Sequence, residues 1–147
     1  MEEDKKTTES IVAENETVTE APKKRKNAKK RFVPNGQVHI QATFNNTIIT
    51  VTDPSGAALT ASSAGANGFR GSKKGTAYAA SIAVEKAIAK AKKDHGLKTA
   101  DVFVKGIGLG RDSSVRAVAT AGVIINSIND KTPIAHGGVR PKGERKP

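Results

Sequence analysis

The segment QVHIQATFNNTIITVT, residues 37–52, predicts the first two strands of a β-sheet. Apolar and polar residues alternate over its first half, as expected of a strand with one buried face. The alternating apolar residues are Val38, Ile40, Ala42 and Phe44. Residues 47–52 are mostly β-branched, which favours a returning strand. Because asparagine tolerates positive φ, Asn45 and Asn46 indicate a two-residue hairpin turn between the strands.

The residues after this hairpin predict a third strand and then alternating helices and strands. Asp53-Pro54-Ser55-Gly56 is typical of a turn, and an alanine-rich helical period ends before Gly96, a common helix stop. Strands joined through helices are normally parallel, so we expect an α/β domain with a mixed sheet in βββαβαβ order and helices packed against it. The predicted strands are 37–44, 47–52, 57–63, 100–105 and 123–128, and the predicted helices are 76–95 and 113–121.

Charge divides the chain into regions. Its 147 residues include 25 basic and 14 acidic side chains, for a net charge of +11. Residues 1–22 hold two basic and seven acidic side chains and lack apolar periodicity, so we expect a disordered acidic extension. The remainder has 23 basic and seven acidic side chains, which favours a polyanionic partner. We divide it into a basic arm (23–35), an α/β domain (36–131) and a basic C-terminal tail (132–147).

Composition disfavours several classes of protein. Cysteine is absent, which excludes thiol chemistry and thiolate metal sites, and aromatic residues are only 3% of the chain, so we do not expect a base-stacking platform. The acidic start does not resemble a signal peptide and no apolar stretch could span a bilayer, so we expect a cytoplasmic protein without membrane contact. His39, His95 and His136 belong to no catalytic or metal motif. We therefore expect no enzyme, no metal or cofactor and no small-molecule substrate.

The glycine-rich segment GFRGSKKG, residues 68–75, is the first candidate binding loop. Small residues expose backbone N–H groups while Arg70, Lys73 and Lys74 add three positive charges, and this combination suits phosphate. The alternative is a surface loop whose lysines are merely solvated. The strongly basic composition of the chain favours phosphate contact.

The second candidate loop, KGIGLGRDSSVR, residues 105–116, lies between a predicted strand and a predicted helix, as dinucleotide-binding loops do. Arg111 stands where that fingerprint has its third glycine, which argues against a nucleotide cofactor. Two interpretations remain: a helix N-terminus at which Arg111 holds a backbone phosphate, and glycine turns that are only structural. We expect Asp112 to cap the helix and to pair with Arg116.

Two basic clusters flank the domain, one in the arm and one in the tail. Neither has apolar positions that would suggest packing, so we expect both to bind a polyanion electrostatically. Lys86, Lys90 and Lys93 share one face of the predicted long helix, where an ordinary solvated surface is the simpler interpretation.

Four blocks in this order, HIQATFNNTIITVTDPSG, GFRGSKKGTAYAA, VKGIGLGRDSSVRA and INDKTPIAHGGVRP, resemble the small-subunit ribosomal protein eleven family in its bacterial form. The resemblance covers about residues 36–141. It implies a ribonuclease-H-like domain without a catalytic site, bound to ribosomal RNA on the platform of the small subunit. It also implies that the protein lies beside messenger RNA where the messenger leaves the subunit. Ribosomal proteins seven, eighteen and twenty-one of the same subunit are the neighbours that the resemblance implies. The family usually has prolines where this chain has Ile107 and Leu109.

On these grounds we expect the protein to be a structural constituent of the small ribosomal subunit. The alternative is a general basic nucleic-acid-binding protein of the nucleoid type, and a nucleotide-dependent enzyme is a weaker rival because no acid or base is evident. The residues expected to bind RNA are Lys23, Lys24, Arg25, Lys26, Lys29, Lys30, Arg31, Asn45, Asn46, Arg70, Gly71, Ser72, Lys73, Lys74, Gly108, Gly110, Arg111, Arg116, His136, Arg140 and Lys142.

Overall fold

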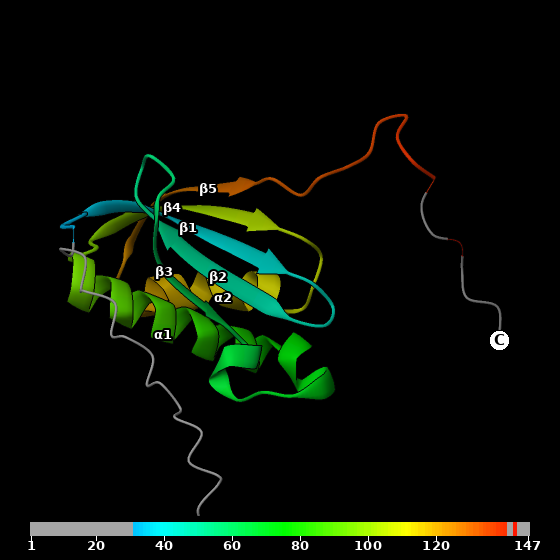
Figure 1. Cartoon of the computed structure of the whole chain (residues 1–147), viewed down its shortest axis with the longest axis horizontal. Coiled ribbons are helices and arrows are strands. Elements are labelled where there is room, and N and C mark those ends of the chain that lie inside the picture. The colour runs from blue at the N-terminus through cyan, green and yellow to red at the C-terminus, as the bar shows by residue number, and fades with distance from the viewer. Residues whose placement is uncertain (1–30, 141–142, 144–147) are drawn as a thin grey trace, which may run out of the picture.

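A computed structural model describes residues 31–140 and residue 143, which are coloured by residue number in Figure 1. Helices and strands follow one another in the predicted order, and two 3₁₀-helices occupy the segment expected to be a polar loop. The elements are β1 (Asn35–Ala42), β2 (Thr47–Thr52), β3 (Ala58–Ser63), the 3₁₀-helices η1 (Gly65–Asn67) and η2 (Gly71–Gly75), α1 (Ala77–His95), β4 (Thr99–Lys105), α2 (Gly110–Thr120) and β5 (Ile124–Asp130). No helix within the described ranges is long and apolar enough to cross a membrane.

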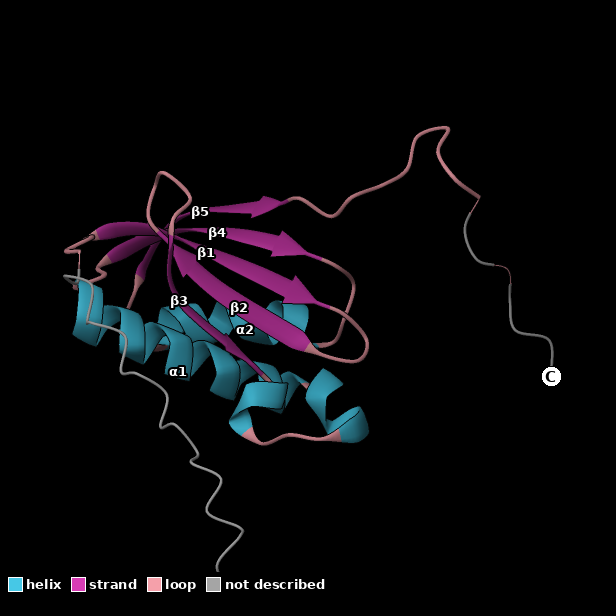
Figure 2. Ribbon diagram, viewed as in Figure 1, coloured by secondary structure: helices cyan, strands magenta, loops and turns pink. Residues whose placement is uncertain are grey.

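The strands form one mixed sheet in the order β3-β2-β1-β4-β5. β1 pairs antiparallel with β2, and β2 pairs antiparallel with β3. β4 pairs parallel with both β1 and β5 because a helix precedes each of the last two strands. Figure 2 shows α1 and α2 on the same face of the sheet, so no described helix covers the opposite face, which we call the open face. The predicted α/β class, mixed sheet and element order are confirmed.

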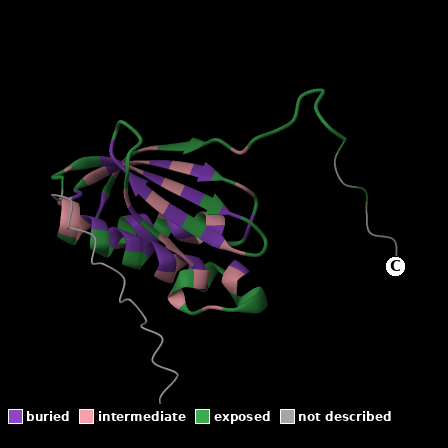
Figure 3. Ribbon diagram, in the orientation of Figure 1, coloured by how far each residue is buried: buried purple, intermediate pink, exposed green. Residues whose placement is uncertain are grey.

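The core lies between the sheet and the two helices, where Figure 3 shows most of the buried residues. Strand residues on the covered face pack against a run of small side chains on α1. The buried residues of α1 are Ala79, Ala80, Ala83, Val84, Ala87, Ile88 and Ala91. Burying a Val or Ile side chain contributes about 1.5 to 3 kcal/mol through the apolar area removed from water, so this face anchors α1 to the sheet.

Local signals set the ends of α1. The hydroxyl of Thr76 accepts a hydrogen bond from the backbone N–H of Ala79 at 3.3 Å, which satisfies one of the free donors at the helix start. Gly96 adopts φ of 69° at the other end, and its N–H donates to the carbonyl of Lys92. The predicted helix stop at Gly96 is confirmed.

The connection between β1 and β2 differs from the prediction. β1 ends at Ala42, so the four residues 43–46 join the strands, and the N–H of Thr43 donates to the carbonyl of Asn46 at 2.9 Å. No non-glycine residue in the described part of the chain has a positive φ, so the predicted two-residue asparagine turn is wrong. Because the strand ends early, Phe44 leaves the buried face and is 69% exposed.

α2 begins at Gly110, three residues before the predicted start. A Cβ at this position would clash with the side chain of Thr47 and crowd that of Ala80, so glycine allows the first turn of α2 to pack directly on β2 and α1. Asp112 therefore lies within the first turn, where its negative charge interacts favourably with the positive end of the helix dipole, and it does not occupy the N-cap. The predicted cap at Asp112 is wrong because the tertiary contact extends the helix backwards.

Candidate nucleic-acid interface

Three connections meet at the end of the sheet where β1 and β4 terminate. They are the β1–β2 turn (43–46), the segment from η1 to the start of α1 (65–78) and the β4–α2 loop (106–109), and we call this region the loop end. Figure 1 shows the three connections together at the right of the view. Folding therefore unites the two glycine-rich candidate loops with the β1–β2 turn.

Glycines let these connections pack main chain against main chain. The N–H of Gly108 donates to the carbonyl of Ala42 at 3.1 Å, and a Cβ on Gly108 would clash with the β1–β2 turn. A Cβ on Gly106 would clash with the carbonyl of Ala42, and one on Gly75 with the carbonyl of Phe44. These contacts support the interpretation in which the glycines of the second loop are structural.

The segment around η2 presents positive charge at the loop end. Arg70 and Lys73 are exposed and Lys74 is half-buried. Nη1 of Arg70 donates to the carbonyl of Gly65 at 2.8 Å, which ties that side chain to η1. Neither lysine forms an ion pair with a described residue, and the sequence has no acidic residue from position 54 to position 84. The local potential at this segment is therefore positive.

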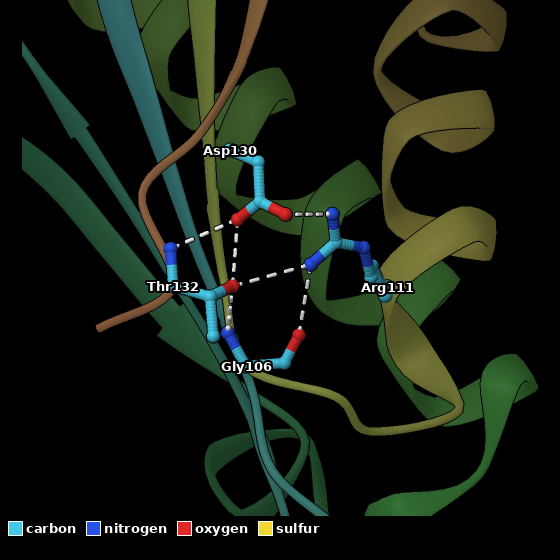
Figure 4. A network of polar contacts seen from close by, with 4 residues as sticks. All are labelled: Gly106, Arg111, Asp130 and Thr132. Atoms are coloured by element: carbon cyan, nitrogen blue, oxygen red, sulfur yellow. Dashed lines mark hydrogen bonds and ion pairs between the residues drawn. The ribbon is translucent and has the colours of Figure 1, made fainter. Parts of the chain in front are cut away.

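Arg111 takes part in an internal network at the base of the C-terminal tail, drawn in Figure 4. Its Nη2 donates to Asp130 at 2.6 Å, and its Nη1 donates to the carbonyl of Gly106 at 3.0 Å and to the hydroxyl of Thr132 at 3.3 Å. The N–H and hydroxyl of Thr132 both donate to the second carboxylate oxygen of Asp130. The network joins the β4–α2 loop to the end of β5.

The electrostatics of the Arg111–Asp130 pair follow from these hydrogen bonds. The hydrogen bond from Arg111, followed by those from Thr132, holds the pKa of Asp130 well below its ordinary value. The same bond is the main cause that raises the pKa of Arg111. Because both side chains remain accessible to water, the pair acts as a partly exposed ion pair that screening weakens. The RNA contact expected of Arg111 is not tested by this geometry, and the pairing with Asp130 favours a structural role for its guanidinium.

The two basic termini leave the domain from opposite ends of the sheet. The tail continues from β5 near the loop end and extends away from the body in Figure 1, with His136 and Arg140 exposed. At the other end, the carbonyl of Arg31 lies 2.7 Å from Nδ1 of His95, and its guanidinium lies 3.9 Å from Asp53. The other predicted residues of the arm, 23–30, and Lys142 lie outside the described residues.

The remaining predicted residues occupy different surroundings. Asn45 is exposed, whereas the side-chain oxygen of Asn46 is buried and has no hydrogen-bond partner among the described residues. Arg116 is exposed beside a groove of about 400 Å³ between α1 and α2, which Asp112 also lines. The described side chains of Asp112 and Arg116 form no ion pair with each other. The pairing predicted between them is therefore wrong. Gly71 and Ser72 are exposed in η2, and Gly108 and Gly110 are buried.

The open face of the sheet carries a different polar arrangement. The rings of His39 and Phe103 stack with their centroids 5.1 Å apart, and Nζ of Lys131 lies 4.5 Å from the centroid of Phe103. Burial lowers the pKa of His39, and the positive charges of Lys105 and Lys131 add to that effect. Within the described ranges, no three His, Asp or Glu side chains gather in a way that could hold a metal ion.

Sequence reasoning missed an apolar surface at the loop end. Phe44 and Tyr78 are each 69% exposed, and Ile107 and Leu109 are 69% and 74% exposed. Two large apolar residues within an otherwise small and polar glycine loop were a usable signal for Ile107 and Leu109. Phe44 offered no such signal because its exposure depends on where β1 ends.

A family model matches the α/β domain and most of the C-terminal tail. The family model of Ribosomal protein S11 matches residues 36–146, from the second residue of β1 almost to the end of the chain. The acidic extension (1–22) and the whole basic arm (23–35) precede this match. Members of the family are structural proteins and not enzymes. The chain belongs to the ribosomal protein S11 family and is an RNA-binding structural protein of the small ribosomal subunit that acts in translation.

Proposed function

We propose that this protein binds small-subunit ribosomal RNA on the platform by neutralising phosphates, chiefly through its loop end and its two basic termini. The observation that supports this proposal most is the positive segment from Arg70 to Lys74. It lies beside the β1–β2 turn and the β4–α2 loop and has no acidic neighbour in sequence. Phosphate contacts of this kind fix the position of RNA without reading its sequence. The protein would thereby hold the platform together and help to shape the exit path of messenger RNA.

Three of the four regions of the chain divide this work. The domain 36–131 positions the loop end, while the tail 132–147 and the arm 23–35 reach RNA on opposite sides of it. The neighbours we infer are ribosomal proteins seven, eighteen and twenty-one, together with messenger RNA. The acidic extension 1–22 lies before the family match and has no assigned contact in this proposal.

Salt dependence of RNA binding tests the proposal. If about 6 to 10 phosphates are neutralised, the affinity for ribosomal RNA should fall on the order of 10³-fold to 10⁵-fold between about 50 and 200 mM salt. The double substitution Lys73→Ala/Lys74→Ala should reduce the slope of log affinity against log salt by about 1.4 to 1.8, because each phosphate contact contributes about 0.7 to 0.9. Measurement by fluorescence anisotropy of labelled RNA gives both quantities.

A matched control removes equal charge elsewhere. Lys90→Ala/Lys93→Ala deletes two exposed lysines from α1 outside the loop end, so the slope should change less. Equal slopes for the two double variants would remove the loop end from the proposal. Equally tight binding of duplex DNA and ribosomal RNA would instead favour the general nucleoid-type protein.

A further inference from the structure

Three of the five Phe and Tyr residues gather at the loop end, although the chain is poor in aromatic residues. Phe44 belongs to the β1–β2 turn, Phe69 lies between η1 and η2, and Tyr78 lies in the first turn of α1. The rings of Phe69 and Tyr78 meet edge to face, with centroids 6.0 Å apart. Folding therefore produces a local concentration of rings that the overall composition does not reveal.

The rings of Phe44 and Tyr78 are not used by the core. Each residue is 69% exposed, yet each is attached to a firmly held backbone. Gly75 packs against the carbonyl of Phe44, and Thr76 caps the helix turn that carries Tyr78. Large apolar side chains held in solvent forgo the gain of burial, and when several occur together they mark a contact surface.

Positive charge flanks these rings. Arg70 and Lys73 are exposed in the segment between Phe69 and Tyr78, and no acidic residue occurs in the β1–β2 turn or from position 54 to position 84. An apolar protein segment would suit the rings alone, whereas single-stranded RNA suits both features. Its bases offer flat faces to aromatic side chains, and its phosphates attract the cations.

We propose that Phe44 and Tyr78 stack against unpaired bases of RNA, and that the loop end therefore prefers single-stranded or looped RNA to continuous duplex. This inference rests on the proposed function and adds a component of binding to it. Phosphate contacts weaken as salt rises, whereas base stacking depends little on salt. The two components can therefore be separated by experiment.

Tyr78 provides a direct probe because it is the only tyrosine and the chain has no tryptophan. Titration of the full-length protein with a short single-stranded oligouridylate should quench its fluorescence saturably, after correction for absorbance with free tyrosine amide in the same RNA. A duplex RNA of equal length should quench it much less. Binding of the oligouridylate, seen by anisotropy, without a change in Tyr78 fluorescence would overturn the contact at Tyr78.

Substitution of the rings measures their contribution. Phe44→Leu and Tyr78→Leu should each weaken binding of the oligouridylate roughly tenfold while leaving the salt slope unchanged. Ile124→Ala, which trims an exposed apolar residue on β5, should leave the affinity unchanged. Circular dichroism confirms that each variant is folded, as expected for substitutions of exposed side chains.

The outcomes separate this inference from the proposed function. If the ring variants bind oligouridylate normally while Lys73→Ala/Lys74→Ala changes the salt slope, the stacking contact is refuted and phosphate binding stands. If neither set of variants alters RNA binding, both proposals fail at the loop end. If the ring variants bind RNA normally but fail to bind a neighbouring ribosomal protein, the rings form a protein-docking surface and the stacking inference is wrong.

Discussion

The two glycine-rich loops have similar compositions but different surroundings. In the first, Gly68 has φ of 91° and nothing lies within 4 Å of an added Cβ. In the second, Gly106 has φ of 96°, yet the carbonyl of Ala42 already occupies the space that a Cβ would need. The arginines differ too, since Arg70 is exposed and bonded to local carbonyls, whereas Arg111, in the first turn of α2, pairs with the carboxylate of Asp130 at the end of β5.

This difference shows that glycine and arginine serve two purposes in one protein. The first loop uses Gly68 and Gly71 to turn the chain and leaves Arg70 and Lys73 facing solvent, and only its last glycine, Gly75, packs against the β1–β2 turn. The second loop uses glycine to let β4 and α2 approach β1, and it uses its arginine to attach the end of β5. Composition favours phosphate contact for the first loop and leaves both phosphate contact and a structural role open for the second, so variants test how far the roles are separate.

The largest effect is expected from a methyl group added at the two matched glycines. Gly106→Ala should reduce the free energy of unfolding by on the order of 4 kcal/mol, because it adds a main-chain clash to the cost of a left-handed conformation. Gly68→Ala should cost only about 1 to 2 kcal/mol, since the conformational cost acts alone. Urea unfolding followed by circular dichroism measures both, and equal losses would show that packing does not distinguish the loops.

Smaller effects are expected from substitution of the two arginines, which should change different quantities: thermal stability for Arg111 and RNA binding for Arg70. Arg111→Ala should lower the Tm because it leaves Asp130 without its ion-pair partner, and it should leave the salt slope of RNA binding nearly unchanged. Arg70→Ala should lower the salt slope by about 0.7 to 0.9, the contribution of one phosphate contact, with less effect on the Tm. Thermal unfolding and anisotropy on the same samples test this, and a reduced slope for Arg111→Ala would assign that residue to RNA as well.

The smallest effect is expected in the acid dependence of stability. Because the pKa of Asp130 is lowered from its ordinary 3.8, its stabilising contribution is present above about pH 4 and is lost as the pH falls further. Asp130→Asn should therefore lower the Tm at neutral pH, and the difference from the unsubstituted protein should shrink between about pH 4 and pH 2. A difference in Tm that stayed constant over this interval would mean that the ion pair does not contribute to folding.

Much of the fold followed from local patterns. Alternation over residues 37–44, the β-branched run at 47–52 and the helical period ending at Gly96 depend on neighbours within a few positions, so they can be recognised without a structure. The same holds for the four sequence blocks that carry the family resemblance, and for the cations of the first loop. The RNA contacts of individual residues remain predictions.

Contacts between distant segments decided the rest. Phe44 is exposed because the chain leaves β1 at Ala42, and α2 starts early because Gly110 fits against β2 and α1. The partnership of Arg111 with Asp130 joins two residues from separate elements, and the sequence on its own does not indicate it. The sequence by itself therefore determined the order of elements, the family and the excess of positive charge, since these depend only on composition and on patterns among neighbouring residues. Tertiary structure alone decided which glycines are packed, which arginine is paired and which rings face solvent, because each depends on what another part of the chain places next to it.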